Sequence, residues 1–301
     1  MRLTKNELSY LGKIYQNKNP LALFSSINAT LRGDEENTLE KKGVLKGGKP
    51  TQEAQKLLGV AAVPQRCTRL VLKDGSYFIE KYAYKTKDGY ALAENDGGDV
   101  LFSPKQQLEE VLFQLSQWVG ISDFRTFDME VTLPNDELLV FLAIADIRRE
   151  IELLSYLGKE TENIISFAQI RGQLEKPKPG GLTSILTGHY NFSVPEADDT
   201  KKILERLTAK KITAFQTGYS LVDSYEEFAR NFLIPQAVVM LEAFNLTEKN
   251  EIAGAGVLCV WAGMREIISI VFREGAVEIA SISGRQLLKM MEDFLNCPDV
   301  I

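Results

Sequence analysis

The spacing of hydrophobic positions along the chain changes from helical to strand-like and back to helical, and this succession occurs twice. In residues 6–16, apolar side chains recur three or four positions apart, which is typical of an amphipathic helix. Thr4 can cap that helix, with Glu7 completing a capping box. Three further helices are expected, one carrying the apolar residues of 20–31, one ending at Gly43 and one capped by Thr51.

A change of period marks the next part of the first half. Residues 67–103 alternate apolar and polar side chains, and Asp-Gly pairs interrupt them at 74–75, 88–89 and 96–97. Asp-Gly between alternating runs is a strong hairpin signal, so we expect an antiparallel meander of three or four strands. A helix over residues 105–119 follows it, with its leucines on one side.

The second half repeats this order. A long helix is expected over 136–156, and further helices are expected over 199–212 and 224–234. Strands are expected within 236–248, 250–264, 266–275 and 275–283, and a closing helix over 284–296.

Short matches between the halves indicate an internal repeat. Residues 3–14 and 133–144 are identical at four of twelve positions, at an offset of 130. Pro64-Gln65 corresponds to Pro235-Gln236 at an offset of 171, and Leu108 corresponds to Leu288 at 180. We therefore predict an α+β fold of two tandem helices–antiparallel meander–helix units, residues 1–120 and 121–301. Such copies usually pack about a pseudo-twofold axis, and their sheets either join or stack.

The growing offset places an insertion at 175–199 of the second unit. This segment has three prolines, three glycines and no strong period, which favours a loop without regular structure. Its apolar residues either cover the unit's own core or bind a partner, and disorder is the third alternative. The candidate partner-binding residues are Leu182, Ile185, Leu186, Tyr190 and Phe192.

Composition and charge indicate an ordinary intracellular protein. The 301 residues carry a net charge of −6, which speaks against nucleic-acid binding because phosphate contacts need clustered Lys and Arg. Three widely spaced cysteines form neither a disulfide framework nor a metal-ligand pattern. No apolar run approaches the roughly 18 residues of a spanning helix, and the first residues lack a signal peptide, so we expect a cytoplasmic protein without membrane insertion.

Residues for catalysis are hard to find. His189 is the single histidine, so it has no second histidine to share a metal or a triad. The glycines of 254–263 lack the G-x-G-x-x-G spacing of a phosphate loop. We therefore predict no catalytic residue, no metal, no cofactor and no enzyme activity. One alternative is a winged-helix transcriptional regulator reading DNA with the helix after Thr51, although that helix has one lysine and no arginine.

Three short motifs resemble those of the EspG family of type VII secretion chaperones. The chain has "LTKNELSYL" at the start, "PTQEAQKLL" before the meander and "FSPKQQLEEVL" after it, in the family's order. The resemblance implies two subdomains about a pseudo-twofold axis and a cytoplasmic, non-catalytic role as a chaperone or adaptor. The composition, rich in Lys, Asn and Ile, points to a Gram-positive source of low GC content, for which the implied partner is a secreted helical hairpin of the WXG100 or LXG type.

Overall fold

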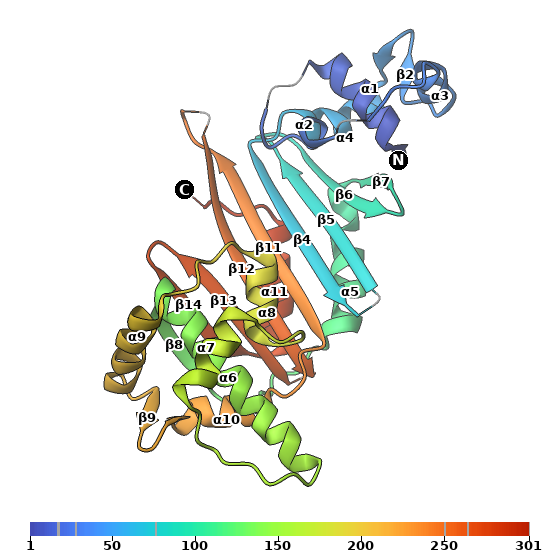
Figure 1. Ribbon diagram of the computed structural model, residues 1–301. Helices are drawn as coiled ribbons and strands as arrows, with labels where there is room; N and C mark the ends of the chain where they lie inside the picture. Colours follow the sequence, from blue (N-terminus) through green and yellow to red (C-terminus); the bar gives the residue numbers. More distant parts are fainter. Residues whose placement is uncertain (17–18, 28, 76, 250, 264, 301) are drawn as a thin grey trace. The chain divides into compact units, whose positions relative to one another are not determined.

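Helices and antiparallel strands alternate in the protein, as expected for an α+β fold. A computed structural model describes residues 1–16, 19–27, 29–75, 77–249, 251–263 and 265–300 (Figure 1). Residues 28, 76, 250 and 264, which fall within or at the ends of expected elements, lie outside the described residues.

The first half begins with a short strand and a cluster of helices. The capping box at Thr4 is present: its side chain accepts a hydrogen bond from the Glu7 N–H (3.2 Å), and its own N–H donates to the Glu7 carboxylate (2.7 Å). Thr51 likewise caps the helix before the meander. The elements are β1 (Arg2–Thr4), α1 (Lys5–Tyr15), α2 (Leu23–Ser26), α3 (Glu35–Lys41), β2 (Leu45–Lys46), β3 (Lys49–Pro50) and α4 (Gln52–Ala62).

The antiparallel meander predicted from the Asp-Gly pairs follows and is confirmed. Its strands pair antiparallel in sequence order, and β1 adds to the last of them, with Leu3 opposite Val100. Gly97 takes a φ of 60°, a left-handed conformation that glycine adopts without strain. The elements are β4 (Arg66–Asp74), β5 (Tyr77–Lys85), β6 (Tyr90–Asp96), β7 (Asp99–Ser103), the 3-10 turn η1 (Lys105–Gln107) and α5 (Leu108–Val119).

The second half has a similar order of elements, with one more α-helix than the first among the residues that the structure describes. Its first strand also pairs antiparallel with the last strand of its meander, with Val131 opposite Ile279. The elements are β8 (Glu130–Pro134), α6 (Asn135–Tyr156), α7 (Phe167–Glu175), α8 (Leu182–His189), α9 (Ala197–Ala209), β9 (Thr213–Phe215), β10 (Tyr219–Leu221), α10 (Asp223–Asn231), β11 (Ala237–Leu246), β12 (Ile252–Gly263), β13 (Glu266–Arg273), β14 (Ala276–Ile282) and α11 (Gly284–Leu295).

The chain divides into two compact units that interleave along the sequence. Unit 1 comprises residues 1–120, 239–257 and 287–301, and unit 2 comprises 121–238 and 258–286. The strand order is β1-β7-β6-β5-β4-β11 in unit 1, and β13-β14-β8 in unit 2. The tandem division at residue 120 and the pseudo-twofold relation of the repeats stay predictions.

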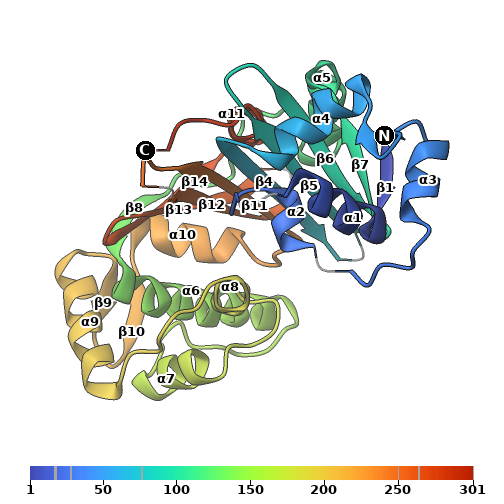
Figure 2. The ribbon, with the colours of Figure 1, turned by 90° about the horizontal axis from the view of Figure 1, so that it is seen from above.

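Unit 1 buries both faces of part of its sheet. Figure 2 shows α1 and α2 on one side of its strands and α5 on the other. The apolar core of the unit includes Leu8, Leu58, Tyr84 and Phe102. On the opposite face, the α11 end of the chain is tied to the sheet because the Tyr90 hydroxyl donates to the carbonyl of Leu295.

Both halves pair a buried glutamate at the start of their first helix with a partly exposed lysine. In α1, Lys42 at the end of α3 donates to the buried Glu7 (2.8 Å). In α6, Lys210 at the end of α9 donates to the buried Glu137 (2.6 Å). Glu7 and Glu137 are related by the offset of 130 found in the sequence, and the pairing gives each of these buried carboxylates the countercharge that it needs.

One expected element is wrong in extent. The helix expected over 20–31 is reduced to the four residues of α2, and Ile27 is already extended. The sequence after Phe24, "SSINAT", is rich in Ser, Asn and Thr, residue types that have a low preference for a helix interior.

Candidate partner-binding surfaces

Residues 175–199 contain a helix, so the expectation of a loop without regular structure is wrong. The segment runs from the end of α7 through α8 to the start of α9. Leu182, Ile185 and Leu186 have the i, i+3, i+4 spacing of a helix face. Helix α8 is only eight residues long. It is too short for its helical period to be recognised in the sequence between the Pro-Gly stretch before it and the extended segment after it.

A carboxylate from another helix caps α8. Gly181 precedes the helix and provides no capping side chain. Asp146 of α6 accepts hydrogen bonds from the backbone N–H groups of Leu182 (2.8 Å) and Thr183 (2.9 Å) instead. A Cβ atom at position 181 would lie 2.7 Å from an Asp146 carboxylate oxygen, so the approach requires glycine.

Asp146 also pairs with Arg149 inside unit 2. Both side chains are buried, and the guanidinium donates to the Asp146 carboxylate and to the carbonyl oxygens of Leu233 (3.0 Å) and Gly180 (3.3 Å). Burial lowers the pKa of Arg149, and the Asp146 charge opposes that shift. The network therefore fastens the Pro-Gly stretch and α8 to the central helix of the unit.

The five candidate residues divide into two groups. Leu182 and Leu186 are fully buried in unit 2, which makes them core residues and withdraws them from any partner. Ile185, Tyr190 and Phe192 are partly exposed. The rings of Tyr190 and Phe192 pack on Phe272 of β13, with centroid distances of 4.6 and 6.2 Å. Partner binding by these three residues stays a prediction.

The histidine and the cysteines considered for chemistry lie apart in exposure: the histidine is exposed and the cysteines are buried. His189 is exposed at the end of α8, and Cys67, Cys259 and Cys297 are buried free thiols. Burial raises the pKa of Cys259 to about 12 and that of Cys297 to about 11, so both thiols stay protonated at neutral pH. In the described part of the chain, no group of acidic, histidine and cysteine side chains is arranged to hold a metal ion. Among those same residues, no helix is long and apolar enough to cross a membrane.

The face of the unit 1 sheet that carries Arg69 is a second candidate surface, which we call the Arg69 face. Strand alternation places its side chains on one side of four neighbouring strands. Helices of unit 1 cover the Tyr84 end of that side, as the shared core of Tyr84 and Leu8 indicates. The residues of the Arg69 face are Arg69, Phe78, Glu80, Tyr82, Asn95, Glu242 and Phe244.

A hydrogen-bond network centred on Glu80 organises the Arg69 face. The Glu80 carboxylate accepts hydrogen bonds from Arg69 (2.8 Å), Tyr82 (2.8 Å) and Asn95 (2.9 Å). Arg69 also donates to Glu242 of β11 (3.2 Å). Side chains held in this way lose little further conformational freedom on binding. The sequence gives no sign of the network, because its partners come from four different strands.

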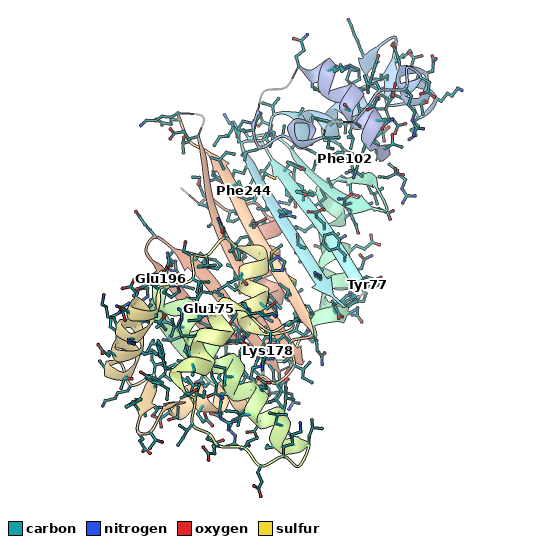
Figure 3. All side chains as sticks on the ribbon, in the orientation of Figure 1. Tyr77, Phe102, Glu175, Lys178, Glu196 and Phe244 are labelled. Atoms are coloured by element: carbon teal, nitrogen blue, oxygen red, sulfur yellow. The ribbon has the colours of Figure 1, made fainter. Side chains whose placement is uncertain are left out.

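Aromatic side chains flank the network. Phe78 is exposed on β5, and Phe244 lies on β11, labelled in Figure 3. A Cβ atom at Gly254 of β12 would lie 2.9 Å from the Phe244 ring, so the ring covers the glycine backbone. Arginine and tyrosine are enriched in interface hot spots. The Arg69 face therefore combines suitable residue types with preorganised geometry.

The pKa of Glu80 predicts an acid-sensitive contribution to stability. Burial opposes ionisation of Glu80, but hydrogen bonds from Asn95, Arg69 and Tyr82 outweigh it and lower its pKa below the ordinary 4.5. This stabilisation is complete above the unfolded-state pKa and is lost as the pH falls through the lower folded-state pKa. In denaturant titrations at pH 6 and pH 3, Glu80→Gln is expected to lose less stability on acidification than the unchanged protein. Glu110→Gln, an exposed change on α5, is the control, and an equal loss in Glu80→Gln and the unchanged protein would contradict the prediction.

Comparison with known proteins bears on the fold. The sequence matches no protein-family profile and no curated protein. One similar solved structure is that of the Mycobacterium tuberculosis type VII secretion system chaperone EspG5 in complex with a PE25–PPE41 dimer. The alignment has a TM-score of 0.56 and 9% sequence identity, and it covers 100% of this chain and 97% of that chain. The chain has an EspG-like fold. The α+β, EspG-like fold that the three sequence motifs implied is thereby confirmed. The pseudo-twofold relation of its subdomains and membership of the EspG family stay predictions.

Proposed function

We propose that the protein is a non-catalytic, cytoplasmic chaperone or adaptor of a type VII secretion system, which binds a secreted protein built on a helical hairpin. The observation that carries the proposal is the likeness to EspG5 over the whole length of both chains. The alignment extends over both units, so the likeness is not confined to a shared local motif. EspG5 itself was solved in complex with a PE25–PPE41 dimer.

We place the partner on the Arg69 face. A helical hairpin exposes apolar side chains at its tip, and an interface needs apolar contacts beside satisfied polar groups. Phe78 and Phe244 supply the apolar contacts, and the pair of Arg69 and Glu242 supplies satisfied polar groups. The partner is proposed to be of the WXG100 or LXG type. Ile185, Tyr190 and Phe192 are a second proposed contact region.

The test is capture of the partner from the cytoplasm of the native host, followed by mass spectrometry and measurement of the affinity with both proteins purified. A secreted helical-hairpin protein is expected as the partner. Recovery of DNA with the protein, or of no partner that survives moderate salt, would contradict the proposal.

Arg69→Ala is expected to weaken that complex by about 2 kcal/mol, roughly thirtyfold in Kd, because the substitution removes a central, preorganised side chain. Arg273→Ala is the control, since Arg273 is also a strand arginine paired with a glutamate (3.0 Å), and it lies exposed in unit 2. Phe192→Ala tests the second region in the same titration. Equal affinities of the Arg69→Ala and Arg273→Ala variants would rule out the Arg69 face.

A further inference from the structure

Three basic side chains lie together on one side of the unit 1 sheet, where β4, β5 and β6 are neighbours (Figure 1). Arg66 of β4 lies directly opposite Lys85 of β5, and Lys85 lies directly opposite Tyr90 of β6. Directly opposite residues point to the same side of a sheet. The ammonium group of Lys105, in η1, lies over the Tyr90 ring, 5.4 Å from its centroid. We call Arg66, Lys85 and Lys105 the basic row.

The basic row converges on the end of α11. Cys297, just beyond that helix, has a buried thiol that contacts the Thr68 hydroxyl (3.8 Å) and donates to the carbonyl oxygen of Ala83 (3.4 Å). Burial raises the pKa of Cys297 to about 11, and a hydrogen bond with Thr68 and the three charges of the basic row oppose that rise. All three cations are therefore close enough to act on one sulfur atom.

A carboxylate already occupies one end of the basic row. Asp299 pairs with the Arg66 guanidinium and accepts a hydrogen bond from the side-chain amide of Asn245 on β11 (2.7 Å). Asn245 is only 3% exposed, so a buried polar side chain positions this carboxylate. The Arg66 end is thus a built carboxylate site, filled by a residue of the chain itself.

The other end of the basic row lacks countercharge. Arg66 and Lys85 are like charges directly opposite each other, an arrangement that destabilises a sheet. Asp299 pairs with Arg66, whereas Lys85 and Lys105 form no ion pair with any residue that the structure describes. The whole chain has a net charge of −6, so this excess of positive charge is local. Such a local positive potential attracts an acidic ligand.

We propose that Lys85 and Lys105 bind two carboxylates of an acidic segment of a partner polypeptide, beside the carboxylate of Asp299. Neighbouring strands lie about 4.8 Å apart, so the row from β4 to β6 spans about 10 Å. Acidic side chains on one face of a helix or strand are about 5–7 Å apart, which fits that span. A single phosphate ion is too small to contact the whole row. The proposal does not depend on the Arg69 face or on a role in secretion.

The test uses the full chain and three probes: acetyl-tetraglutamate amide, its neutral counterpart acetyl-tetraglutamine amide, and inorganic phosphate. Chemical-shift titration is expected to give saturable binding of tetraglutamate, with the largest shifts around Lys85 and Lys105. Tetraglutamine is expected to bind about tenfold more weakly, since each exposed ion pair contributes about a factor of three. Raising the salt concentration is expected to weaken tetraglutamate binding, because the contact is exposed.

The double variant Lys85→Gln/Lys105→Gln is expected to weaken tetraglutamate binding about tenfold. The matched control is Lys46→Gln/Lys49→Gln. Lys46 and Lys49 are also directly opposite each other in unit 1, and both are exposed. This control variant is expected to bind tetraglutamate as the unchanged protein does.

The melting temperature of the single variant Lys85→Gln separates ligand binding from a structural role. The variant removes one of two opposed like charges, so its melting temperature is expected to be unchanged or higher. If Lys85 served only to stabilise the carbonyl end of α11, the melting temperature would fall. Such a fall, equal binding of tetraglutamine, equal loss in the control variant, phosphate binding as tight as that of tetraglutamate, or no saturable binding of tetraglutamate would each overturn the proposal.

Discussion

Replacing Asp146 with alanine is expected to destabilise unit 2 by about 3–5 kcal/mol, the usual cost of leaving one buried charge without its partner. The change removes the carboxylate that pairs with Arg149 and caps α8 at Leu182 and Thr183. The free energy of unfolding from denaturant titration measures the effect. Hydrogen exchange in α8 is expected to rise more than in α1, because α8 loses its cap.

Glu150→Ala is the matched control, one turn further along α6. Glu150 is exposed and pairs at the surface with Lys178, so its loss is expected to cost less than about 1 kcal/mol. Asp146→Asn keeps the shape and the acceptor oxygen but removes the charge, so it is expected to lie between the two and to stay folded. A cost for Asp146→Asn no larger than for Glu150→Ala would show that the buried charge is unimportant.

Phe228→Ala is expected to cost about 3–5 kcal/mol, as do other truncations of fully buried aromatic side chains. Phe228 of α10 is completely buried. Its ring packs against Phe127 (5.4 Å), Phe232 (5.5 Å) and Phe141 of α6 (6.3 Å between centroids). Neighbours on three sides cannot collapse fully into the space, so a cavity remains. Thermal and denaturant unfolding measure the change.

Phe215→Ala provides the comparison for this truncation. Phe215 of β9 is 58% exposed and packs on Tyr219 alone among the aromatic rings that the structure describes. Its removal leaves no enclosed cavity, so a loss within about 1 kcal/mol is expected. If both truncations destabilise equally, the aromatic cluster around Phe228 is not a principal part of the core of unit 2.

Signals confined to a few residues allowed much of the fold to be predicted. Thr4 with Glu7, and Thr51 ahead of α4, mark helix starts because cap and capped N–H lie three positions apart. The Asp-Gly pairs mark the hairpins of the first meander because a hairpin turn is likewise determined by a few neighbouring residues. The offset of 130 between the first helices also has a physical counterpart in the recurring ion pairs of Glu7 and Glu137.

Features that depend on distant partners could not be predicted in this way. Strand β1 has three residues and is a strand because β7, almost a hundred positions later, pairs with it. The cap of α8 comes from Asp146, 36 residues before Leu182. Arg69 donates a hydrogen bond to Glu242, which lies 173 positions later in the sequence. No local period contains these distances, so the Arg69 face and the cap of α8 were recognisable only once the fold was known.

The interleaving of the two units has a consequence for synthesis on the ribosome. Residues 1–120 emerge first, but β11 and the end of α11, which belong to the same unit, follow only after residues 121–238. At roughly 5–20 residues per second, that interval lasts about 6–24 seconds. During it, β4 has an unpaired edge, which is prone to pairing with other chains. Nascent chains are thus expected to engage general folding factors at this stage, and unit 1 to become protease-resistant only after its final residues leave the exit tunnel.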